Sequence, residues 1–341
     1  MKSLQLATVL FLVGSPAWAQ AGDPQSSAQI TQIGDDHTAT VNQSRISNDV
    51  MLHQEGRGQQ ALIDQQGQSA GANRADIKQS GAENTAVLWQ NALVGASETV
   101  AQIRQDGTAN GLDLRQVGYP SVLTAAIAQV GDRNWAAVGQ ESVFTGPNTL
   151  TLEQVGDAND GRIAQALRNA GGSEASLIQH GTQNQARLHQ TGGDSDHHRM
   201  QVEQDGTDNF AFVNQAISGG TNEATVFQTG SFNNARIEQS RATLGGPFQA
   251  AIEQDGDGNS AAISQQSGWA SDFAASISQT GNGNEATVSQ TATQASLSAV
   301  IVQDGDTNKV SLTQIAEAGA SFVSTLSQIG SNNSATVLQG P

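Results

Sequence analysis

The sequence predicts an all-β fold, a stacked β-solenoid of about thirteen two-stranded repeats with the cross-β geometry of amyloid. The first observation is the motif Q-x-G-x-x-N-x-A-x-[VIL]-x-Q, which recurs thirteen times at steps of 22 to 26 residues. The second is that its fixed residues stand two positions apart on either side of the centre, which is the side-chain period of a strand. The third is the short G-x-x-N segment between these two runs. A period of this length indicates one unit stacked many times.

The first strand of each repeat is expected to end at a leading glutamine, two residues after an Ile, Leu or Val. In one repeat the inward positions are Asn73, Ala75, Ile77 and Gln79. Such rows of small aliphatic side chains make a thin core, so a single two-stranded unit is not stable alone. The leading glutamines are Gln32, Gln54, Gln79, Gln105, Gln129, Gln154, Gln179, Gln204, Gln228, Gln254, Gln279, Gln303 and Gln328.

The turn of each repeat follows the leading glutamine. Glycine and asparagine are the residues that most readily take positive φ, so G-x-x-N predicts a β-arch or a short turn. The turn glycines are Gly34, Gly56, Gly81, Gly107, Gly131, Gly156, Gly181, Gly206, Gly230, Gly256, Gly281, Gly305 and Gly330.

The second strand repeats the inward pattern, for example at Asn84, Ala86, Leu88 and Gln90, and ends at a closing glutamine. The asparagine fails twice, where His37 and Gln59 replace it and are expected to weaken the first two turns. The asparagines are Asn84, Asn110, Asn134, Asn159, Asn184, Asn209, Asn233, Asn259, Asn284, Asn308 and Asn333. The closing glutamines are Gln43, Gln65, Gln90, Gln116, Gln140, Gln165, Gln190, Gln215, Gln239, Gln265, Gln290, Gln314 and Gln339.

Stacking of the units supplies what each unit lacks. At a strand spacing of about 4.8 Å, every backbone N–H and C=O finds a partner above or below. The glutamines and asparagines then align into side-chain amide ladders, and a buried amide outside such a ladder is costly. We therefore expect these amide residues to be stacking and polymerisation residues, and further copies of the chain to be partners.

Three segments are expected along the chain. Residues 1–19 resemble a signal peptide, with a basic start at Lys2, an apolar run that is too short to span a bilayer, and an A-x-A-like cleavage site at residues 17–19. Residues 20–25 form a short mature N-terminal segment, and residues 26–339 form the repeats. No transmembrane segment is expected, and the chain contains no cysteine, which fits an exported protein that uses no disulfide.

The chain is acidic, with a formal net charge of −17. Removal of Lys2 with the signal segment gives −17 − 1 = −18, so nucleic acid is not an expected partner. Thirteen acidic residues lie in the four-residue turns after the leading glutamines, and stacking is expected to place them along one ridge. Three interpretations remain open: solvated turn residues, like charges that slow premature stacking, and a cation-binding ridge.

No catalytic, cofactor or metal site is expected, and the chain is not predicted to be an enzyme. His197 and His198 adjoin Asp194 and Asp196 in one loop, where metal ligands occur together, but a flexible insertion is the simpler interpretation. Trp89, Trp135 and Trp269 are expected to be outward or loop residues with a surface-packing role.

The repeat resembles the curlin repeat, the unit of the curli fibre subunits, over residues 26–339. The resemblance rests on the S/N-x-A-x-I-x-Q strand, the G-x-x-N turn and the A-x-[VIL]-x-Q strand, with Ser26, Asn73 and Ser173 as opening residues. It implies a secreted subunit that folds outside the outer membrane into a β-solenoid and polymerises end to end into extracellular amyloid fibres for biofilm and adhesion. It also implies a nucleator subunit and an outer-membrane export machinery as partners.

The chain departs from the family in its thirteen units, in the opening residues Leu123, Phe248 and Phe322, and in the short segment 20–25, where the family has a longer sorting stretch. The regular, uncharged last unit favours a polymer-forming subunit over a nucleator. The alternative is a monomeric or surface-tethered solenoid adhesin. An adhesin needs capped terminal coils, and the chain begins and ends its repeats close to its termini, which favours the polymer.

Overall fold

The computed structural model describes residues 26–44, 47–67, 71–93, 97–143, 146–168, 172–193, 197–217, 219–241, 247–268, 272–294, 296–317 and 319–340. Within these ranges every regular element is a β-strand, which confirms the all-β prediction. The predicted signal peptide (1–19) and the short segment 20–25 lie outside the described residues, as does Trp269.

Each repeat contributes one odd-numbered strand, which ends near the leading glutamine, and one even-numbered strand, which ends near the closing glutamine. The odd-numbered strands are β1 (Ser27–Asp35), β3 (Asn48–Arg57), β5 (Ala72–Ala82), β7 (Glu98–Thr108), β9 (Val122–Asp132), β11 (Asn148–Asp157), β13 (Ser173–Thr182), β15 (His197–Thr207), β17 (Thr221–Ser231), β19 (Phe248–Asp255), β21 (Asp272–Thr280), β23 (Ser296–Asp304) and β25 (Ser321–Ile329). The even-numbered strands are β2 (Thr38–Ser44), β4 (Gln60–Gly67), β6 (Thr85–Ala92), β8 (Gly111–Tyr119), β10 (Trp135–Val143), β12 (Asp160–Arg168), β14 (Gln185–Gly193), β16 (Phe210–Ala216), β18 (Asn234–Arg241), β20 (Ser260–Ser267), β22 (Glu285–Ala292), β24 (Lys309–Ala316) and β26 (Ser334–Gln339).

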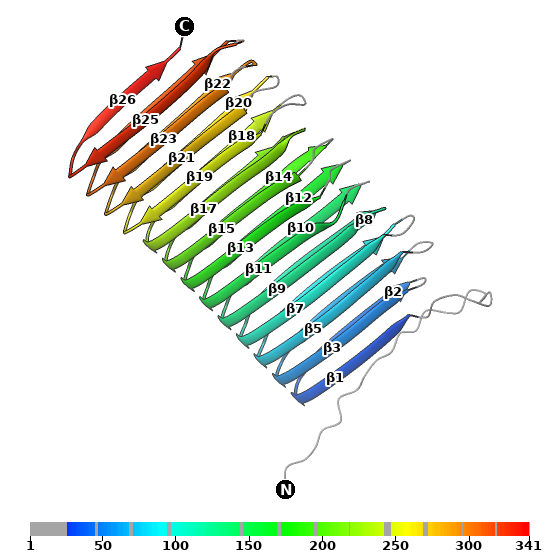
Figure 1. Cartoon of the computed structure of the whole chain (residues 1–341). Helices are drawn as coiled ribbons and strands as arrows, with labels where there is room; N and C mark the ends of the chain where they lie inside the picture. The colour runs from blue at the N-terminus through cyan, green and yellow to red at the C-terminus, as the bar shows by residue number, and fades with distance from the viewer. Residues whose placement is uncertain are drawn as a thin grey trace. The chain divides into compact units, whose positions relative to one another are not determined.

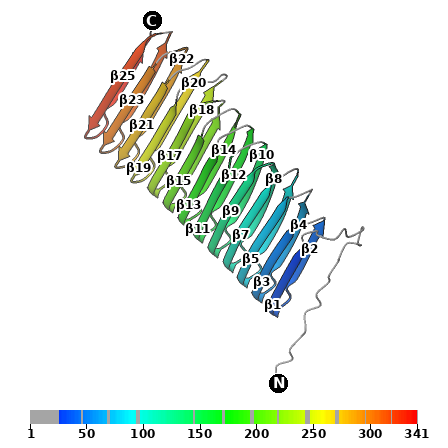
Figure 2. The ribbon, with the colours of Figure 1, turned by 45° about the vertical axis from the view of Figure 1, so that its right-hand side comes forward.

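The chain divides into two compact units, Met1–Arg162 and Ile163–Pro341. In the first unit the strand orders are β1-β3-β5-β7-β9-β11 and β2-β4-β6-β8-β10; in the second they are β13-β15-β17-β19-β21-β23-β25 and β14-β16-β18-β20-β22-β24-β26. Within each unit odd-numbered strands form one layer and even-numbered strands the other (Figure 1, Figure 2). Each unit is therefore a stack of two-stranded coils, which confirms the β-solenoid.

The strands in each layer are parallel and pair equivalent positions of neighbouring coils. Gln254 lies opposite Gln279, and Ile252 lies opposite Ile277. Side chains along a strand alternate between buried and exposed, as they do along the whole of β19. Because the period of a strand is two, a one-residue slip would turn the whole inward row to solvent, so the thin aliphatic core itself specifies the register.

The joint between the two strands of a coil is a β-arch, since the strands it connects lie in different sheets. All thirteen turn glycines have positive φ, between 98° and 128°. The prediction that the asparagine also takes positive φ is wrong: the residue before it does so, for example Glu83 (57°), Arg133 (57°) and Phe232 (60°). These exposed positions carry varied residues because the αL conformation, although uncommon outside glycine, is allowed.

The turn glycine is required by packing as well as by φ. A Cβ built on Gly256 would lie 2.2 Å from the carbonyl oxygen of Gly281 in the next coil. The same holds along both units: a Cβ built on a turn glycine would lie 1.9 to 2.3 Å from the carbonyl oxygen of the turn glycine in the next coil. The arches therefore stack at the strand spacing only if this position has no side chain.

We expect Gly256→Ala to destabilise the folded chain by at least about 2 kcal/mol, because alanine is strained at this φ and its methyl group meets the next coil's backbone. The matched control is Gly258→Asn in the same arch. Gly258 has φ +66° with open space around its Cβ position, and asparagine tolerates that conformation. Guanidinium unfolding followed by circular dichroism measures both variants, and equal midpoints for them would contradict the packing argument.

Candidate functional site

The leading glutamines form a side-chain ladder along each unit. In the first unit Nε2 of each donates to Oε1 of the next, from Gln32 through Gln54, Gln79, Gln105 and Gln129 to Gln154, at 2.8 to 2.9 Å. In the second unit the same bonds run from Gln179 through Gln204, Gln228, Gln254, Gln279 and Gln303 to Gln328. Every donor points toward the following coil, so the ladder has a direction.

The closing glutamines form a second ladder with the same direction. In the first unit it joins Gln43, Gln65, Gln90, Gln116 and Gln140 at 2.8 to 3.0 Å. In the second unit it joins Gln165, Gln190, Gln215, Gln239, Gln265, Gln290, Gln314 and Gln339 at 2.8 to 3.1 Å. Both sets of glutamines thus occupy equivalent inward sites on the two facing sheets.

The second amide hydrogen of these glutamines ties the two sheets together. Gln90 Nε2 donates to the carbonyl of Arg74 on the first strand of its own coil, at 3.0 Å. Gln79 Nε2 donates to the carbonyl of Gln60 on the second strand of the preceding coil, also at 3.0 Å. Both side chains are fully buried. A buried amide without partners costs about 1–3 kcal/mol, and here each amide is bonded along the stack and across it.

The asparagines clamp neighbouring arches together. Oδ1 of Asn84 accepts the backbone N–H of Asn110 at 3.0 Å, and Nδ2 of Asn84 donates to the carbonyl of Gly107 in the next coil at 3.0 Å. The second unit repeats the pattern, for example from Asn233 to Asn259 and Gly256. The asparagine is therefore a buried intercoil clamp rather than the positive-φ residue of the turn.

The two substituted clamps keep part of this bonding. Gln59 Oε1 accepts the backbone N–H of Asn84 at 3.0 Å, and Nδ1 of His37 lies 3.3 Å from the backbone nitrogen of Gln59. Each replacement retains a side-chain acceptor for the following coil. The acceptor bond is thus present in both coils in which the sequence suggested a weakened turn.

The acidic turn residues occupy three kinds of position, one of which is the positive-φ residue before the asparagine, as in Glu83 and Asp208. The residue after the turn glycine can accept a backbone N–H of the preceding coil, as Asp257 Oδ1 does from Ser231 (2.7 Å) and Asp306 Oδ1 does from Asn282 (2.8 Å). The residue after the leading glutamine is an exposed acid in Asp255 and Asp304. In register these two acids flank Thr280, so they lie in every second coil. Asp132 and Asp157, which follow the turn glycine, lie in adjacent coils, as expected.

One column of inward residues was underestimated from the sequence, the position that opens each first strand. Up to β17 this position is mostly polar: Asn73 Nδ2 donates to Asn48 Oδ1 (2.7 Å), and Thr99 Oγ1 donates to Asn73 Oδ1 (2.6 Å). From β19 onward it is apolar. Phe248 and Phe273 stack with ring centroids 4.7 Å apart, in a buried cluster that also contains Ile217, Ala292, Leu297 and Ala316. The loss of a Ser or Asn at Phe248 is the signal that marks this change.

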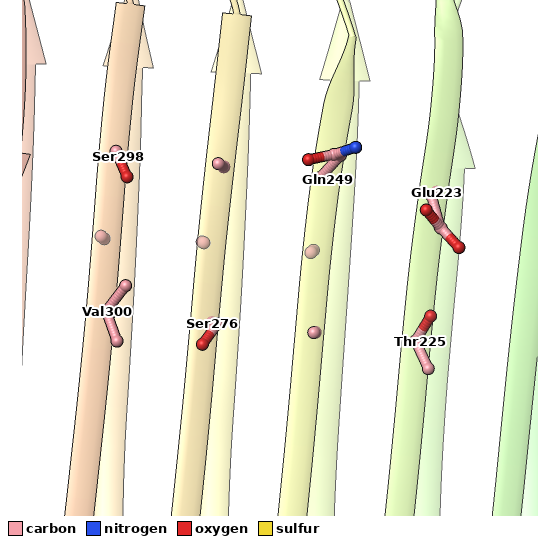
Figure 3. Close-up of a pocket in the computed structure, with 11 residues that line it drawn as sticks. Glu223, Thr225, Gln249, Ser276, Ser298 and Val300 are labelled. Carbon is pink, nitrogen blue, oxygen red and sulfur yellow. The ribbon is translucent and has the colours of Figure 1, made fainter.

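The outer faces of the described sheets carry few convergent polar groups. A shallow trough of about 390 Å³ crosses β17, β19, β21 and β23 and is lined by small side chains such as Ala251 and Ser276, with Glu223 as its ionisable residue (Figure 3). On the even-numbered strands the guanidinium of Arg115 covers the ring of Trp89, and that of Arg236 covers Phe212. Trp89 and Trp135 lie at outward positions on their strands, and these aromatic side chains pack along the surface.

Among the described residues, no cluster of three or more His, Cys, Asp or Glu side chains is suited to a metal ion. Asp194 and Asp196 of the sequence-predicted loop lie outside the described ranges. Among the same residues, no helix is long and apolar enough to cross a membrane. The strongest feature in the described residues is the set of intercoil amide bonds.

We expect Gln254→Ala to lower the free energy of unfolding by about 2–4 kcal/mol, because it removes a buried side chain and leaves its ladder neighbours unpaired. Gln254 bonds to Gln228, Gln279 and the carbonyl of Asn234. The control is Glu253→Ala, since Glu253 is the exposed neighbour on the same strand. Denaturant unfolding of both variants is the measurement, and equal losses would show that the ladder contributes nothing specific.

No protein-family model matches the chain, and no curated protein matches it.

Proposed function

We propose that the chain is a structural subunit of secreted, curli-like functional amyloid fibres that serve in biofilm matrix, surface adhesion and cell aggregation. The observation that carries the proposal is the direction of the glutamine ladders. In the first unit the leading ladder begins at Gln32 and the closing ladder at Gln43, each donating through Nε2 to the next coil. In the second unit the two ladders end at Gln328 and Gln339, each accepting through Oε1 from the coil before it. A second copy placed end to end would continue donor to acceptor.

The outer edges of the described stack also favour such pairing. Within the described strands, β1 and β2 pair with a neighbour on one side, as do β25 and β26. Ile329 and Leu338 on the last described coil are 77% and 72% exposed. In register, the position of Leu338 is occupied two coils earlier by Ser289. Ser289 has a further coil on either side and is half-buried. Unpaired strand edges with apolar side chains are templates for further strands.

The curlin resemblance supplies the cellular part of the proposal. It supports export of the chain, directed by residues 1–19, through the periplasm to the cell surface, with an outer-membrane export machinery and a nucleator subunit as partners. Glutamines repeated at the same inward position of successive coils support the amyloid type, because in-register ladders of equal side chains contribute to cross-β stability.

The alternative is a monomeric or surface-tethered solenoid adhesin. Exposed aromatic residues outside the core favour it, namely Phe232 in an arch (65% exposed) and Trp135 on β10 (44% exposed). An adhesin of this kind would bind its target as a monomer, whereas a fibre subunit would show a concentration-dependent lag and respond to seeds.

We expect the purified mature chain to assemble into fibres that give reflections at about 4.8 Å and about 10 Å. Electron microscopy over time, thioflavin T fluorescence and fibre diffraction measure this. A chain that stays monomeric for days at high micromolar concentration, with or without preformed seeds, would exclude the fibre proposal and leave the adhesin.

For the acidic turns we propose that repulsion between carboxylates slows premature stacking. Alternation of Asp255 and Asp304 with Thr280 sets like charges about two strand spacings apart, roughly 10 Å, which is close to the screening length at about 0.1 M salt. We expect Asn at Asp205, Asp255 and Asp304 together to shorten the lag of fibre assembly at low ionic strength.

The control for this variant removes the same charge elsewhere, through D113N, E203Q and E253Q on the strands. Added salt is expected to remove the difference between the turn variant and the parent, because it screens the repulsion. If the turn variant assembles no faster than the strand control at low ionic strength, the acidic residues are solvated turn residues without a gatekeeper role.

A further inference from the structure

One imidazole is built into the core of the second unit. His198 opens β15 in the inward column and is 1% exposed. In register it lies between Ser173 of β13 and Asn222 of β17. A Cβ built on Gly192 would lie 3.1 Å from Nε2 of His198, which places the far side of the ring against the end of β14. The ring therefore occupies the site that asparagine or serine fills in neighbouring coils.

The hydrogen bonds around His198 specify a neutral ring. Nδ1 lies 3.1 Å from Nδ2 of Asn222, and the same Nδ2 lies 3.3 Å from the carbonyl oxygen of Gly219 and 3.2 Å from that of Gly220. A carbonyl oxygen can bond to Nδ2 of Asn222, which donates, but not to its Oδ1, which accepts. The two carbonyls therefore hold the Asn222 amide with Nδ2 on the side of the imidazole. Nδ1 must then be the acceptor, and the proton of the neutral ring lies on Nε2.

Protonation of Nδ1 breaks this arrangement in either of two ways. If Asn222 keeps its orientation, two donors face each other in the core. If the Asn222 amide turns over, Oδ1 meets the new N–H, but Nδ2 leaves the carbonyl oxygens of Gly219 and Gly220. The first outcome places two buried donors against each other. The second gives a bond to Oδ1, which has no partner among the described residues in the neutral arrangement, but breaks the two bonds from Nδ2 to the carbonyl oxygens.

The described inward positions of the strands packed against His198 carry no acidic side chain. On its own strand, His197 and Arg199 are exposed and cationic or ionisable. Glu174 on β13 and Glu223 on β17 follow the inward residues Ser173 and Asn222 and so lie at outward positions. Oε2 of Glu174 is 3.8 Å from Nε of Arg199. The inward residues of β14 and β16, such as Leu188, Gln190, Val213 and Gln215, carry no charge. Asp194 and Asp196 lie outside the described residues.

We propose that His198 makes folding of the coil formed by β15 and β16 sensitive to acid, so that this part of the solenoid forms fully only where the imidazole is neutral. The proposal rests on the position of the ring in the column and on its bond to Asn222. It concerns folding of the single chain and does not depend on the fibre proposal.

The pH window follows from the two states of the ring. Burial, with a smaller contribution from the nearby His197, lowers the pKa of His198 from 6.5 to about 4. Between these values the unfolded chain binds a proton that the folded chain does not, so folding stability falls as pH falls. The contribution is fully present above pH 6.5 and fully lost below about pH 4.

The experiment compares the mature parent chain with H198N. This variant has asparagine at position 198, the same residue type that the next coil has at Asn222. Guanidinium unfolding at pH 7.5 and pH 5.0 gives the folding equilibrium constant at each pH. Between pH 7.5 and pH 5.0 the folding equilibrium constant of the parent is expected to fall by a factor about 30 times larger than that of H198N. This factor follows from the linkage relation with the two pKa values. The exposed neighbour serves as control: H197N should keep most of the parent's pH dependence, because burial is the larger cause of the lowered pKa of His198 and His197 the smaller.

A direct measurement covers the case in which H198N folds poorly. Carbon-13-labelled histidine in the folded parent chain should show one imidazole that remains neutral down to about pH 4 with its proton on Nε2, as its ring-carbon shifts report. Equal pH dependence of the parent and H198N, or titration of every histidine near pH 6.5, would overturn the proposal.

Discussion

The alignment of buried amides between successive coils is the constraint on which the rest of the structure depends. A glutamine in this core has two donors and an acceptor to satisfy, and it can do so only if the next coil presents a glutamine at the same height and the facing strand presents a carbonyl. Gln79 meets both conditions, through Gln105 and the carbonyl of Gln60. A coil out of register would lose its aliphatic contacts and its amide bonds together, so the ladder enforces both spacing and alignment.

The arch follows from this constraint. Coils that stack at strand spacing bring the backbones of successive turns into contact, and a glycine such as Gly107 allows that approach because it has no Cβ. The asparagine then closes the gap between turns, accepting one backbone N–H and donating to one carbonyl of the next coil. Together these residues let a chain with 4% aromatic residues bury its backbone without a large apolar core.

Parity and period were sufficient to predict the two strands per repeat, the inward glutamines and the β-solenoid, because a strand alternates its side chains regardless of context. The asparagine was predicted to take positive φ in the turn, whereas the structure shows that it bonds to the next coil. Either role favours asparagine at this position, so the sequence does not distinguish them. Residues such as Arg133 take the positive φ instead; an exposed position leaves almost no sequence signal. The staggering of Asp255 and Asp304 and the bond between His198 and Asn222 depend on which coils are neighbours in register, and variable loops obscure that register in the sequence.

A fibre subunit, as proposed, would use the same amide bonds between molecules that it uses between its own coils, so the central claim concerns those bonds. The most direct measurement is hydrogen exchange of side-chain amides in the folded chain with nitrogen-15-labelled glutamine. The account predicts two populations: ladder glutamines such as Gln79 and Gln254, whose Nε2 hydrogens exchange as slowly as the backbone of the strands, and exposed glutamines such as Gln102 and Gln249, which exchange freely. Uniformly fast exchange of all glutamine side chains would contradict it.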